Sequence, residues 1–336
     1  MAVHPLATGV DMGVDGGVPN AIIETRALSY VFRSRRGDVH AVAGVDLSVR
    51  RGEIFGFLGP NGAGKTTTLR MLATLLPPTG GEARIAGHDL RREPARVRER
   101  IGYVGQEGGS DPNVTGRREL VFQGGLHGMG GAERARRAQD IITRLALEEC
   151  ADRPVSTYSG GQKRRLDIGL GLVHEPDVLF LDEPTTGLDP QSRARMWDEV
   201  RRLRDGGTTV FLTTHYMEEA DVLCDRLAII DHGRIVAEGT PEELKRQIAG
   251  DVVTMGVAGD PGDALALLRD QPSVREASVE EGKIRLYVDH GEASLPVLLR
   301  ALDAAHVEIA TLSLARPSLD DVFLRQTGRS LREDSN

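Results

Sequence analysis

Three short apolar runs along the chain each end in polar or small residues. The runs cover residues 54–58, 178–181 and 209–212. Apolar runs of this length, bounded by polar or turn-forming residues, are typical of strands buried on both faces of a parallel sheet. The first run is followed by residues 67–75, in which leucines recur at helical spacing. We therefore expect an α/β fold whose parallel strands bring their carboxyl ends together at one edge of a sheet.

The first run leads directly into a glycine-rich loop. Gly59, Gly64, Lys65 and Thr66 fit the pattern G-x-x-x-x-G-K-[ST]. Glycine lets the backbone approach a ligand closely, and the N–H groups at the start of the following helix face an anion. Lys65 is suited to reach β- and γ-phosphate oxygens, and the Thr66 hydroxyl is suited to bind Mg²⁺. The predicted nucleotide-binding residues of this loop are Gly59, Pro60, Asn61, Gly62, Ala63, Gly64, Lys65, Thr66 and Thr67.

Residues suited to phosphoryl transfer follow the other two runs. Asp182 and Glu183 come directly after the second run, and His215 comes shortly after the third. Beside a phosphate loop, Asp182 would bind Mg²⁺ and Glu183 would act as general base on the attacking water. His215 would contact the γ-phosphate, so Lys65, Glu183 and His215 are the predicted catalytic residues. Gln106, in a loop after another apolar stretch, is a further candidate for the magnesium site.

Each of these residues has an ordinary alternative when it is taken alone. Two acids after a strand often begin a solvated turn, a histidine often caps a helix or lies on the surface, and a glutamine in a loop is usually solvated. Their common place at strand ends, downstream of the phosphate loop, favours the catalytic interpretation.

A second anion-binding segment is indicated at residues 159–162. Ser159 offers a hydroxyl, Gly160 and Gly161 offer unobstructed backbone N–H groups, Gln162 follows, and a helix can begin just after them. Taken alone, a Ser-Gly-Gly stretch is also typical of a turn or linker.

The ordered motifs GPNGAGKTT, GQ at 105–106, YSGGQ, LFLDEP, GLDP at 187–190 and TTH resemble the ATP-binding cassette (ABC) family over roughly residues 22–243. This resemblance implies a P-loop NTPase domain with a RecA-like core, an antiparallel β subdomain and a helical subdomain. It further implies a head-to-tail dimer, a homodimer or a heterodimer, with two ATP molecules between one chain's phosphate loop and the other chain's signature residues 159–162.

The same resemblance assigns three single residues. Asp189 would lie across the dimer interface, although the residue also fits a turn aspartate before Pro190. Phe32 aligns with the aromatic residue that stacks on adenine, and Tyr30 is the alternative. Tyr158 stands where the family most often has leucine, which leaves the phosphate-facing residues intact.

The chain is expected to divide into three parts. Residues 1–20 lack a basic start and a long apolar stretch, so we expect a disordered tail rather than a signal peptide. Residues 21–248 would form the ABC ATPase domain, with its helical subdomain at about 92–170. Residues 249–336 would form a small α+β domain, because 252–257 and 284–288 resemble strands while 264–268 and 295–302 resemble helices.

The helical subdomain and the chain end carry two further expectations. A glycine-rich break is expected at residues 124–131, and residues 107–115 are the predicted docking segment for a membrane subunit. The tail PSLDDVFLRQTGR at 317–329 resembles the ATPase subunits of drug exporters of the daunorubicin-resistance type. It also fits an amphipathic helix that packs within the C-terminal domain.

Composition and hydropathy exclude two kinds of function for this chain, nonspecific nucleic-acid binding and a transport path of its own across a membrane. The net charge of −8 argues against nonspecific nucleic-acid binding. Cys150 and Cys224 are far apart and are expected to be reduced thiols. No apolar segment is long enough to span a bilayer, so a transporter would need a separate membrane permease. We expect a peripheral ATPase at the cytoplasmic face of the membrane that powers export of a small drug or antibiotic, with an importer subunit and a soluble non-transport ABC ATPase as alternatives.

Overall fold

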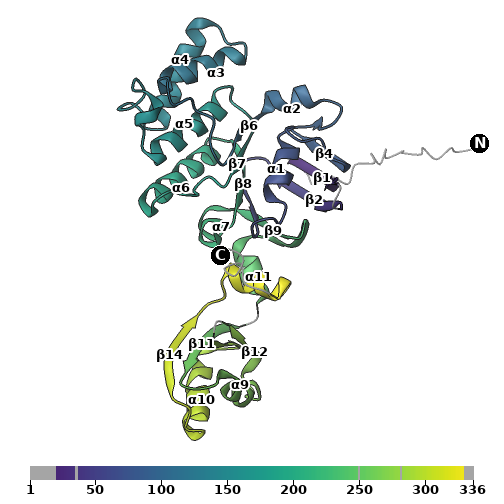
Figure 1. Ribbon diagram of the computed structural model, residues 1–336, viewed down its shortest axis with the longest axis vertical. Coiled ribbons are helices and arrows are strands. Elements are labelled where there is room, and N and C mark those ends of the chain that lie inside the picture. The colour runs from purple at the N-terminus through teal and green to yellow at the C-terminus, as the bar shows by residue number, and fades with distance from the viewer. Residues whose placement is uncertain (1–19, 35–36, 249, 281, 329–336) are drawn as a thin grey trace, which may run out of the picture.

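The computed structural model describes residues 20–34, 37–248, 250–280 and 282–328. The tail expected at 1–20 lies outside these residues except for Asn20. The described residues form an upper ATPase part and a lower C-terminal part that is drawn out along the long axis (Figure 1). None of the described helices is both long enough and apolar enough to cross a membrane.

A six-stranded sheet forms the centre of the ATPase part, with the strand order β10-β9-β3-β8-β7-β6. Its strands are β3 (Ile54–Leu58), β6 (Ile101–Val104), β7 (Val178–Asp182), β8 (Thr209–Thr214), β9 (Arg226–Asp231) and β10 (Arg234–Gly239). The pairings are parallel except for that of β10 with β9, which is antiparallel. The three predicted apolar runs are therefore neighbours, β3-β8-β7, and their carboxyl ends meet at one edge as expected.

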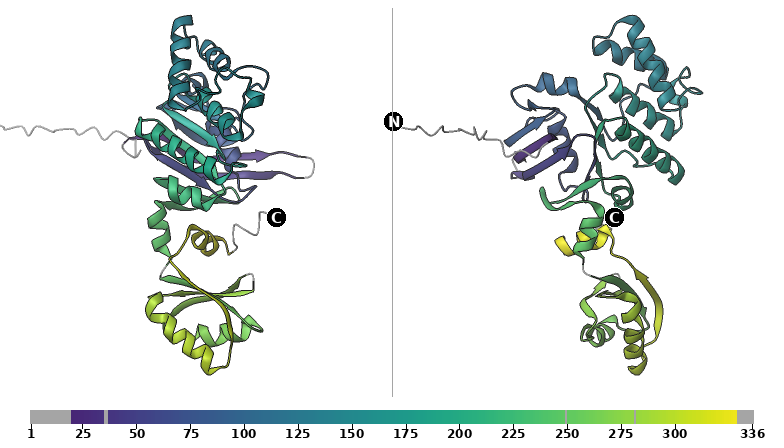
Figure 2. Two further views of the ribbon diagram at one scale, coloured as in Figure 1. Left: turned by 90° about the vertical axis from the view of Figure 1, so that its left-hand side faces the viewer. Right: turned by 180° about the vertical axis from the view of Figure 1, so that it is seen from behind.

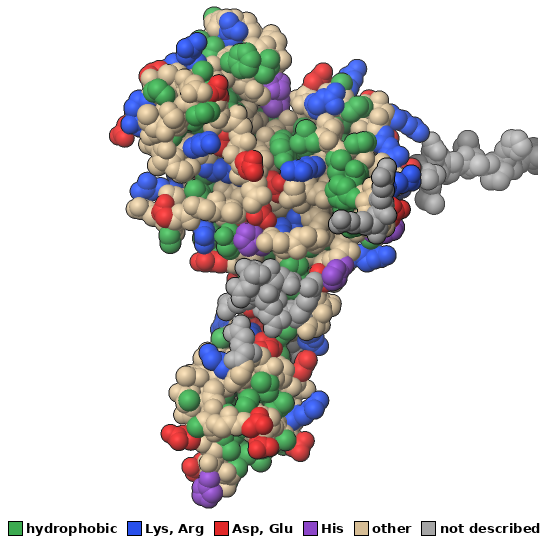
Figure 3. Space-filling view, in the orientation of Figure 1, with side chains coloured by type: hydrophobic (Ala, Val, Ile, Leu, Met, Phe, Trp, Pro, Cys, Tyr) green, Lys and Arg blue, Asp and Glu red, His purple; other side chains and the backbone are tan. Residues whose placement is uncertain are grey.

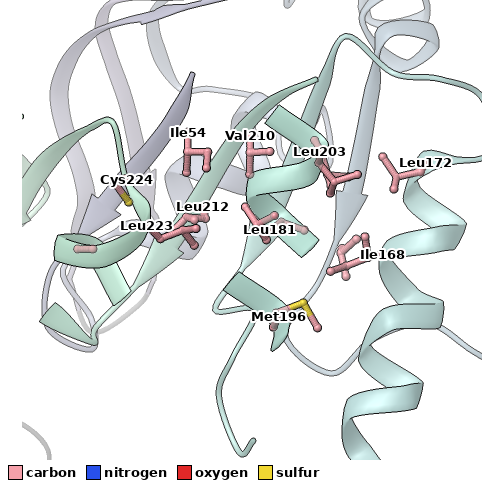
Figure 4. Packing of buried hydrophobic residues seen from close by; sticks show 14 of the residues in the cluster. Ile54, Ile168, Leu172, Leu181, Met196, Leu203, Val210, Leu212, Leu223 and Cys224 are labelled. Atoms are coloured by element: carbon pink, nitrogen blue, oxygen red, sulfur yellow. The ribbon is translucent and has the colours of Figure 1, made fainter. Parts of the chain in front are cut away.

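Helices cover one face of this sheet. They are α5 (Gly160–Leu172), α6 (Pro190–Asp205) and α7 (Met217–Leu223). Figure 4 shows side chains from these helices, including Ile168, Met196 and Leu223, packed against Leu181 and Val210 of the strands. Both faces of the central strands are buried, which explains why their sequences are continuous apolar runs rather than alternating ones.

The other face packs against α1 (Lys65–Leu72) and an antiparallel sheet. That sheet has the order β2-β1-β4-β5 and contains β1 (Ala21–Phe32), β2 (Val39–Arg50), β4 (Gly80–Ile85) and β5 (His88–Asp89). Phe55, Phe57, Phe180 and Phe211 of the central strands lie in this second core. Helix α1 ends at Leu72, three residues before the predicted end, and Leu75 is exposed.

The helical region contains α2 (Pro94–Arg100), α3 (Gly116–Leu126) and α4 (Gly131–Arg144), followed by a short turn of helix at Val155–Thr157. Two details differ from expectation. Strand β6 lies inside the range 92–170 expected to be helical. The predicted glycine-rich break is shorter than 124–131, because Gly124 and Gly125 belong to α3. A Cβ atom at Gly124 would lie 3.0 Å from the Cβ atom of Arg134, so this glycine lets α3 and α4 pack closely.

The C-terminal part contains its own antiparallel sheet, in the order β12-β13-β11-β14. The elements are β11 (Asp251–Val257), α9 (Pro261–Arg269), β12 (Val274–Glu280), β13 (Lys283–Val288), α10 (Gly291–Ala304) and β14 (Ile309–Ala315). The predicted strands at 252–257 and 284–288 and helices at 264–268 and 295–302 are present. Alternate residues such as Val253 and Leu286 form a separate core with α9 and α10, which lie on one face of the sheet (Figure 2).

The last described helix, α11 (Leu319–Thr327), returns to the ATPase part. A capping box between Ser318 and Asp321 starts it, so the predicted amphipathic helix is present. The alternative interpretation placed the apolar face of this helix in the core of the C-terminal domain. That core does not contain residues of α11. Leu319, Val322 and Phe323 instead join the ATPase core, beside α7, β10 and α8 (Pro241–Gln247). On the small sheet, Val252 and Tyr287 contribute to this cluster. Asp321 of α11 also pairs with Arg285 and accepts a hydrogen bond of 3.0 Å from the Tyr287 hydroxyl.

Candidate functional site

The phosphate loop is held in place by close backbone contacts. Gly64 precedes α1 with a φ of 105°, and a Cβ atom there would lie 2.3 Å from the carbonyl oxygen of Ala41. The carbonyl of Ala63 accepts a hydrogen bond of 2.9 Å from the N–H of Gly233. A side chain at position 64 would therefore collide with backbone from β2, which explains why only glycine fits.

Lys65 lies inside the loop that precedes it. Its Nζ donates hydrogen bonds to the carbonyl oxygens of Gly59 at 2.7 Å and Pro60 at 3.0 Å, and lies 3.5 Å from Oε1 of Glu183. Burial lowers the pKa of Lys65, and the nearby Glu183 partly opposes this effect. The side chain is 4% exposed, so solvent screens its charge little and its attraction to nearby anionic groups is strong.

Asp182, at the end of β7, accepts hydrogen bonds from two threonine hydroxyl groups. Thr66 Oγ1 donates to Oδ1 of Asp182 at 3.0 Å, and Thr213 Oγ1 donates to the same oxygen at 2.6 Å. Thr213 also accepts a hydrogen bond of 3.1 Å from the N–H of Glu183. The ends of α1, β7 and β8 thus meet at one carboxylate, as the parallel strands predicted.

Glu183 has the largest set of polar neighbours in this cluster. Its Oε2 lies 3.2 Å from His215 Nδ1 and accepts hydrogen bonds from Thr186 Oγ1 at 3.2 Å and from Gln106 Nε2 at 3.3 Å. Burial opposes ionisation of this carboxyl, but contact with His215 and the charge of Lys65 outweigh it and hold the pKa of Glu183 below its usual value. Its φ is 45°, a left-handed conformation that is uncommon outside glycine.

An open pocket of about 490 Å³ reaches Lys65 and Glu183, whereas Asp182 and His215 lie behind its lining. Its lining contains Asn61, Gly62, Gly64, Lys65, Thr66, Thr67, Gln106 and Glu183 from the predicted set. Phe32 lies at the pocket with 47% of its surface exposed, whereas Tyr30 packs against the core and meets Phe32 edge to face at 4.7 Å. The structure therefore places Phe32, and not Tyr30, on the pocket wall.

Sequence reasoning missed two groups of lining residues. Val39, His40 and Ala41 come from β2, while His232 and Gly233 come from the turn between β9 and β10. Neither group lies in a phosphate-binding motif. A weak signal was present at Gly233, since a glycine after a strand indicates a tight turn, but its closeness to the phosphate loop arises from tertiary packing.

The predicted signature residues and Asp189 lie on an exposed edge outside this lining. Ser159 is the N-cap of α5 and forms a capping box with Gln162. Gly161 faces Ser192 of α6, because a Cβ atom at Gly161 would lie 3.2 Å from its Oγ. Asp189 is exposed and caps α6 by accepting a hydrogen bond of 2.9 Å from the N–H of Ser192. The starts of both helices are thus neighbours on this exposed edge.

The remaining single-residue expectations have clear positions. Tyr158 packs against the core and its hydroxyl donates to the carbonyl of Cys150 at 2.7 Å, while burial raises the pKa of Tyr158 to about 12. Cys150 and Cys224 are free, buried thiols, as expected.

Two protein-family descriptions match the chain. Residues 42–186 match "ABC transporter", and residues 239–327 match "ATP-binding protein DrrA1-3-like, C-terminal domain". The chain is 46% identical over 313 residues to the daunorubicin/doxorubicin resistance ATP-binding protein DrrA of Streptomyces peucetius, covering 92% of this chain and 93% of that protein. It is 43% identical over 305 residues to the Nod factor export ATP-binding protein I of Ralstonia nicotianae, covering 90% and 94%.

A solved structure agrees with these matches. It is a dimeric ATP-binding cassette in a post-hydrolysis state bound to ADP and Pi, with a TM-score of 0.60 and 25% identity over 65% of this chain and 98% of that one. The fold, the motifs and the relatives agree from the phosphate loop to α11. The chain therefore belongs to the ATP-binding cassette family, as an ATP-hydrolysing subunit of the exporter type that resembles the DrrA drug-resistance proteins.

Proposed function

We propose that this chain binds ATP with Mg²⁺ in the pocket around Lys65 and uses Glu183 as general base for hydrolysis. The carrying observation is the environment of Glu183, whose carboxylate meets His215, Lys65 and Gln106 within 3.5 Å. Its pKa lies below the usual value, so the group is an ionised carboxylate near neutral pH, and its position rather than its basicity suits it to take the proton of the attacking water.

The proposed hydrolysis follows from these positions. The water oxygen forms a bond to the γ-phosphorus while the bond to the bridging oxygen of ADP breaks, and Glu183 takes the water proton. Lys65 and the loop N–H groups would bind phosphate oxygens, and His215 would hold the Glu183 carboxylate in place and contact the γ-phosphate. ADP and phosphate are the products, and the proton returns to solvent.

Mg²⁺ fits the donors present at the end of β7. Thr66, Asp182 and Gln106 offer hydroxyl, carboxylate and amide oxygens, which are the ligands that Mg²⁺ prefers. The ion would neutralise phosphate charge there. Gln106 now donates its Nε2 to Glu183, so binding the ion through its oxygen requires rotation of the amide.

We infer that the ATPase works as a dimer of two such chains, identical or different. The observation in support is that residues 159–162 and Asp189 are displayed on an edge apart from the pocket of their own chain. The N–H groups at the starts of α5 and α6 suit the phosphate of ATP held by a second chain. Closure of the dimer on ATP and reopening after hydrolysis would then supply mechanical work.

The proposed partner is a separate multi-spanning permease, which would hold this chain at the cytoplasmic face of the membrane. A groove of about 510 Å³ runs beside Gly108 and Gly109, within the predicted docking segment 107–115, and is lined also by Gln123 and His127 of the helical region. We propose that this groove receives a short helix of the permease. On the face in Figure 3, acidic and basic side chains are interspersed, which suits a protein partner better than nucleic acid.

The proposed cargo is a small molecule such as a drug or antibiotic, moved outwards. Relatives named for drug resistance and for Nod factor export support the outward direction over import or a soluble, non-transport role. Because those two names point to different compounds, the permease would choose the cargo.

Glu183→Gln tests this function, with Glu218→Gln on the exposed start of α7 as the matched control. We expect Glu183→Gln to bind ATP normally, to hydrolyse it at least 100-fold more slowly, and to accumulate as a closed dimer with ATP and Mg²⁺. Full turnover by Glu183→Gln would reject the assignment of the base. Tagged Glu183→Gln purified from native membranes should bring a permease with it, and recovery of ribosomes or DNA without a permease would reject the transport role.

A further inference from the structure

Helix α7 begins two residues after His215 and carries a completely buried glutamate. Glu219 is 0% exposed, whereas the neighbouring Glu218 is exposed. Burial raises the pKa of the Glu219 carboxyl above its usual value. A polar group inside a core costs free energy unless it is hydrogen bonded, so its partners show what the group holds together.

One oxygen of Glu219 joins two other segments of the site. Its Oε1 accepts a hydrogen bond from Thr185 Oγ1 at 2.8 Å and another from Trp197 Nε1 at 3.1 Å. Thr185 is completely buried and lies two residues after Glu183. Trp197 lies on α6, the helix that begins after its cap at Asp189. Glu219 therefore ties the turn after β7, helix α6 and helix α7 to one atom.

A second contact joins the same helices closer to the start of α6. The guanidinium carbon of Arg193 lies 4.7 Å from the centre of the Tyr216 ring, and that ring packs against His215 with centres 4.0 Å apart. Arg193 and Trp197 are four residues apart, so they lie on one face of α6. Both contacts therefore connect that face to the segment that carries His215.

We propose that Glu219 is a positioning residue for ATP hydrolysis, which couples the placement of Glu183 and His215 to the position of helix α6. This inference rests on the proposed function, since it takes Glu183 and His215 as the catalytic pair. Glu219 acts through Thr185 and through α7 rather than on the nucleotide. Because α6 begins at the exposed edge where the second chain is expected, a shift of α6 on dimer closure reaches both catalytic residues.

Three variants of the full-length protein test the proposal. Glu219→Met has a similar length but no acceptor for Thr185 and Trp197. Glu219→Gln keeps a carbonyl oxygen for both donors, and Glu218→Met makes the same change on the exposed neighbour. We expect kcat to fall about 10- to 100-fold in Glu219→Met, since small misplacements of catalytic groups cost this much. Glu219→Gln and Glu218→Met should keep kcat within about threefold of the unmodified protein, because they preserve the hydrogen bonds.

ATP affinity separates positioning from general damage. Measured by calorimetry with EDTA to prevent hydrolysis, the dissociation constant of Glu219→Met should stay within about twofold, because Glu219 does not line the pocket. Trp197 is the single tryptophan of the chain, so its fluorescence reports the same hydrogen bond. ATP should change its emission in the unmodified protein and in Glu219→Gln but not in Glu219→Met.

Two outcomes would overturn the proposal. One is a kcat for Glu219→Met within about twofold of the unmodified protein although the Trp197 emission has changed. The other is a joint loss of kcat, ATP affinity and urea resistance, which would make Glu219 a purely structural residue. Glu183→Gln is measured in the same assay, and full turnover there rejects the proposed base itself and is thus distinguishable from a failure at Glu219.

Discussion

Replacement of Gly64 by alanine should disable the phosphate loop, and replacement of Gly52, in the turn between β2 and β3, provides the matched control because Gly52 does not line the pocket. Both glycines have positive φ values, 105° at Gly64 and 75° at Gly52. A Cβ atom at Gly64 would lie 2.3 Å from the carbonyl oxygen of Ala41, while one at Gly52 would meet open space. The two substitutions therefore share the backbone strain of about 1–3 kcal/mol, but only Gly64→Ala adds a collision.

The magnitude of the effect follows from that collision. Ordinary contact begins near 3.4 Å, so the loop or strand β2 must move by about 1 Å to admit the methyl group at Gly64. Such a shift removes at least one N–H hydrogen bond to phosphate, worth about 1.5–3 kcal/mol for a charged acceptor. The dissociation constant for ATP should therefore rise about 10- to 150-fold in Gly64→Ala. In Gly52→Ala it should stay within about threefold, because strain there lowers stability without displacing the loop.

Titration calorimetry with ATP in EDTA measures both constants, and urea unfolding measures both stabilities. If Gly64→Ala binds ATP as tightly as Gly52→Ala while both remain folded, the reasoning from close backbone approach is wrong. A loss of affinity in both variants to the same extent would assign the effect to positive φ alone.

Two further predictions concern stability. Phe323→Ala should lower the free energy of unfolding by about 3–5 kcal/mol, because Phe323 is completely buried in the ATPase core; urea unfolding checks this, and early proteolytic cleavage around α11 should accompany it. Glu183 should contribute stability above its unfolded-state pKa near 4.5, and because its folded-state pKa is lower, that contribution is lost as the pH falls through the folded value. The urea midpoint of the unmodified protein should therefore drop more between about pH 5 and pH 3 than that of Glu183→Gln, and equal drops would contradict the lowered pKa.

The pattern of residues predicted the parts of the site whose chemistry restricts residue type. The phosphate loop, Asp182, Glu183 and His215 could be recognised because phosphate binding and proton transfer accept few side chains at strand ends. Strands buried on both faces can also be recognised as apolar runs, which is why β3, β7 and β8 were predicted. The contribution of β2 and of the turn at His232 and Gly233 to the pocket lining could not be predicted. These residues reach the pocket through the packing of the backbone, which requires no particular side chain and so produces no sequence motif.

The packing partner of helix α11 could not be predicted from the sequence either. The capping box and apolar spacing of α11 predicted a helix, but the apolar spacing does not indicate which surface the helix packs against. The N-terminal half of this stripe, Leu319, Val322 and Phe323, lies in the same core cluster as Ala220 and Leu223 of α7. Since α7 also carries Glu219 and follows His215, α11 packs against the helix that supports the proposed catalytic segment. The small sheet has its own core, so the apolar face of α11 belongs in packing terms to the ATPase, while Asp321 on the same helix bonds to Arg285 and Tyr287 of β13.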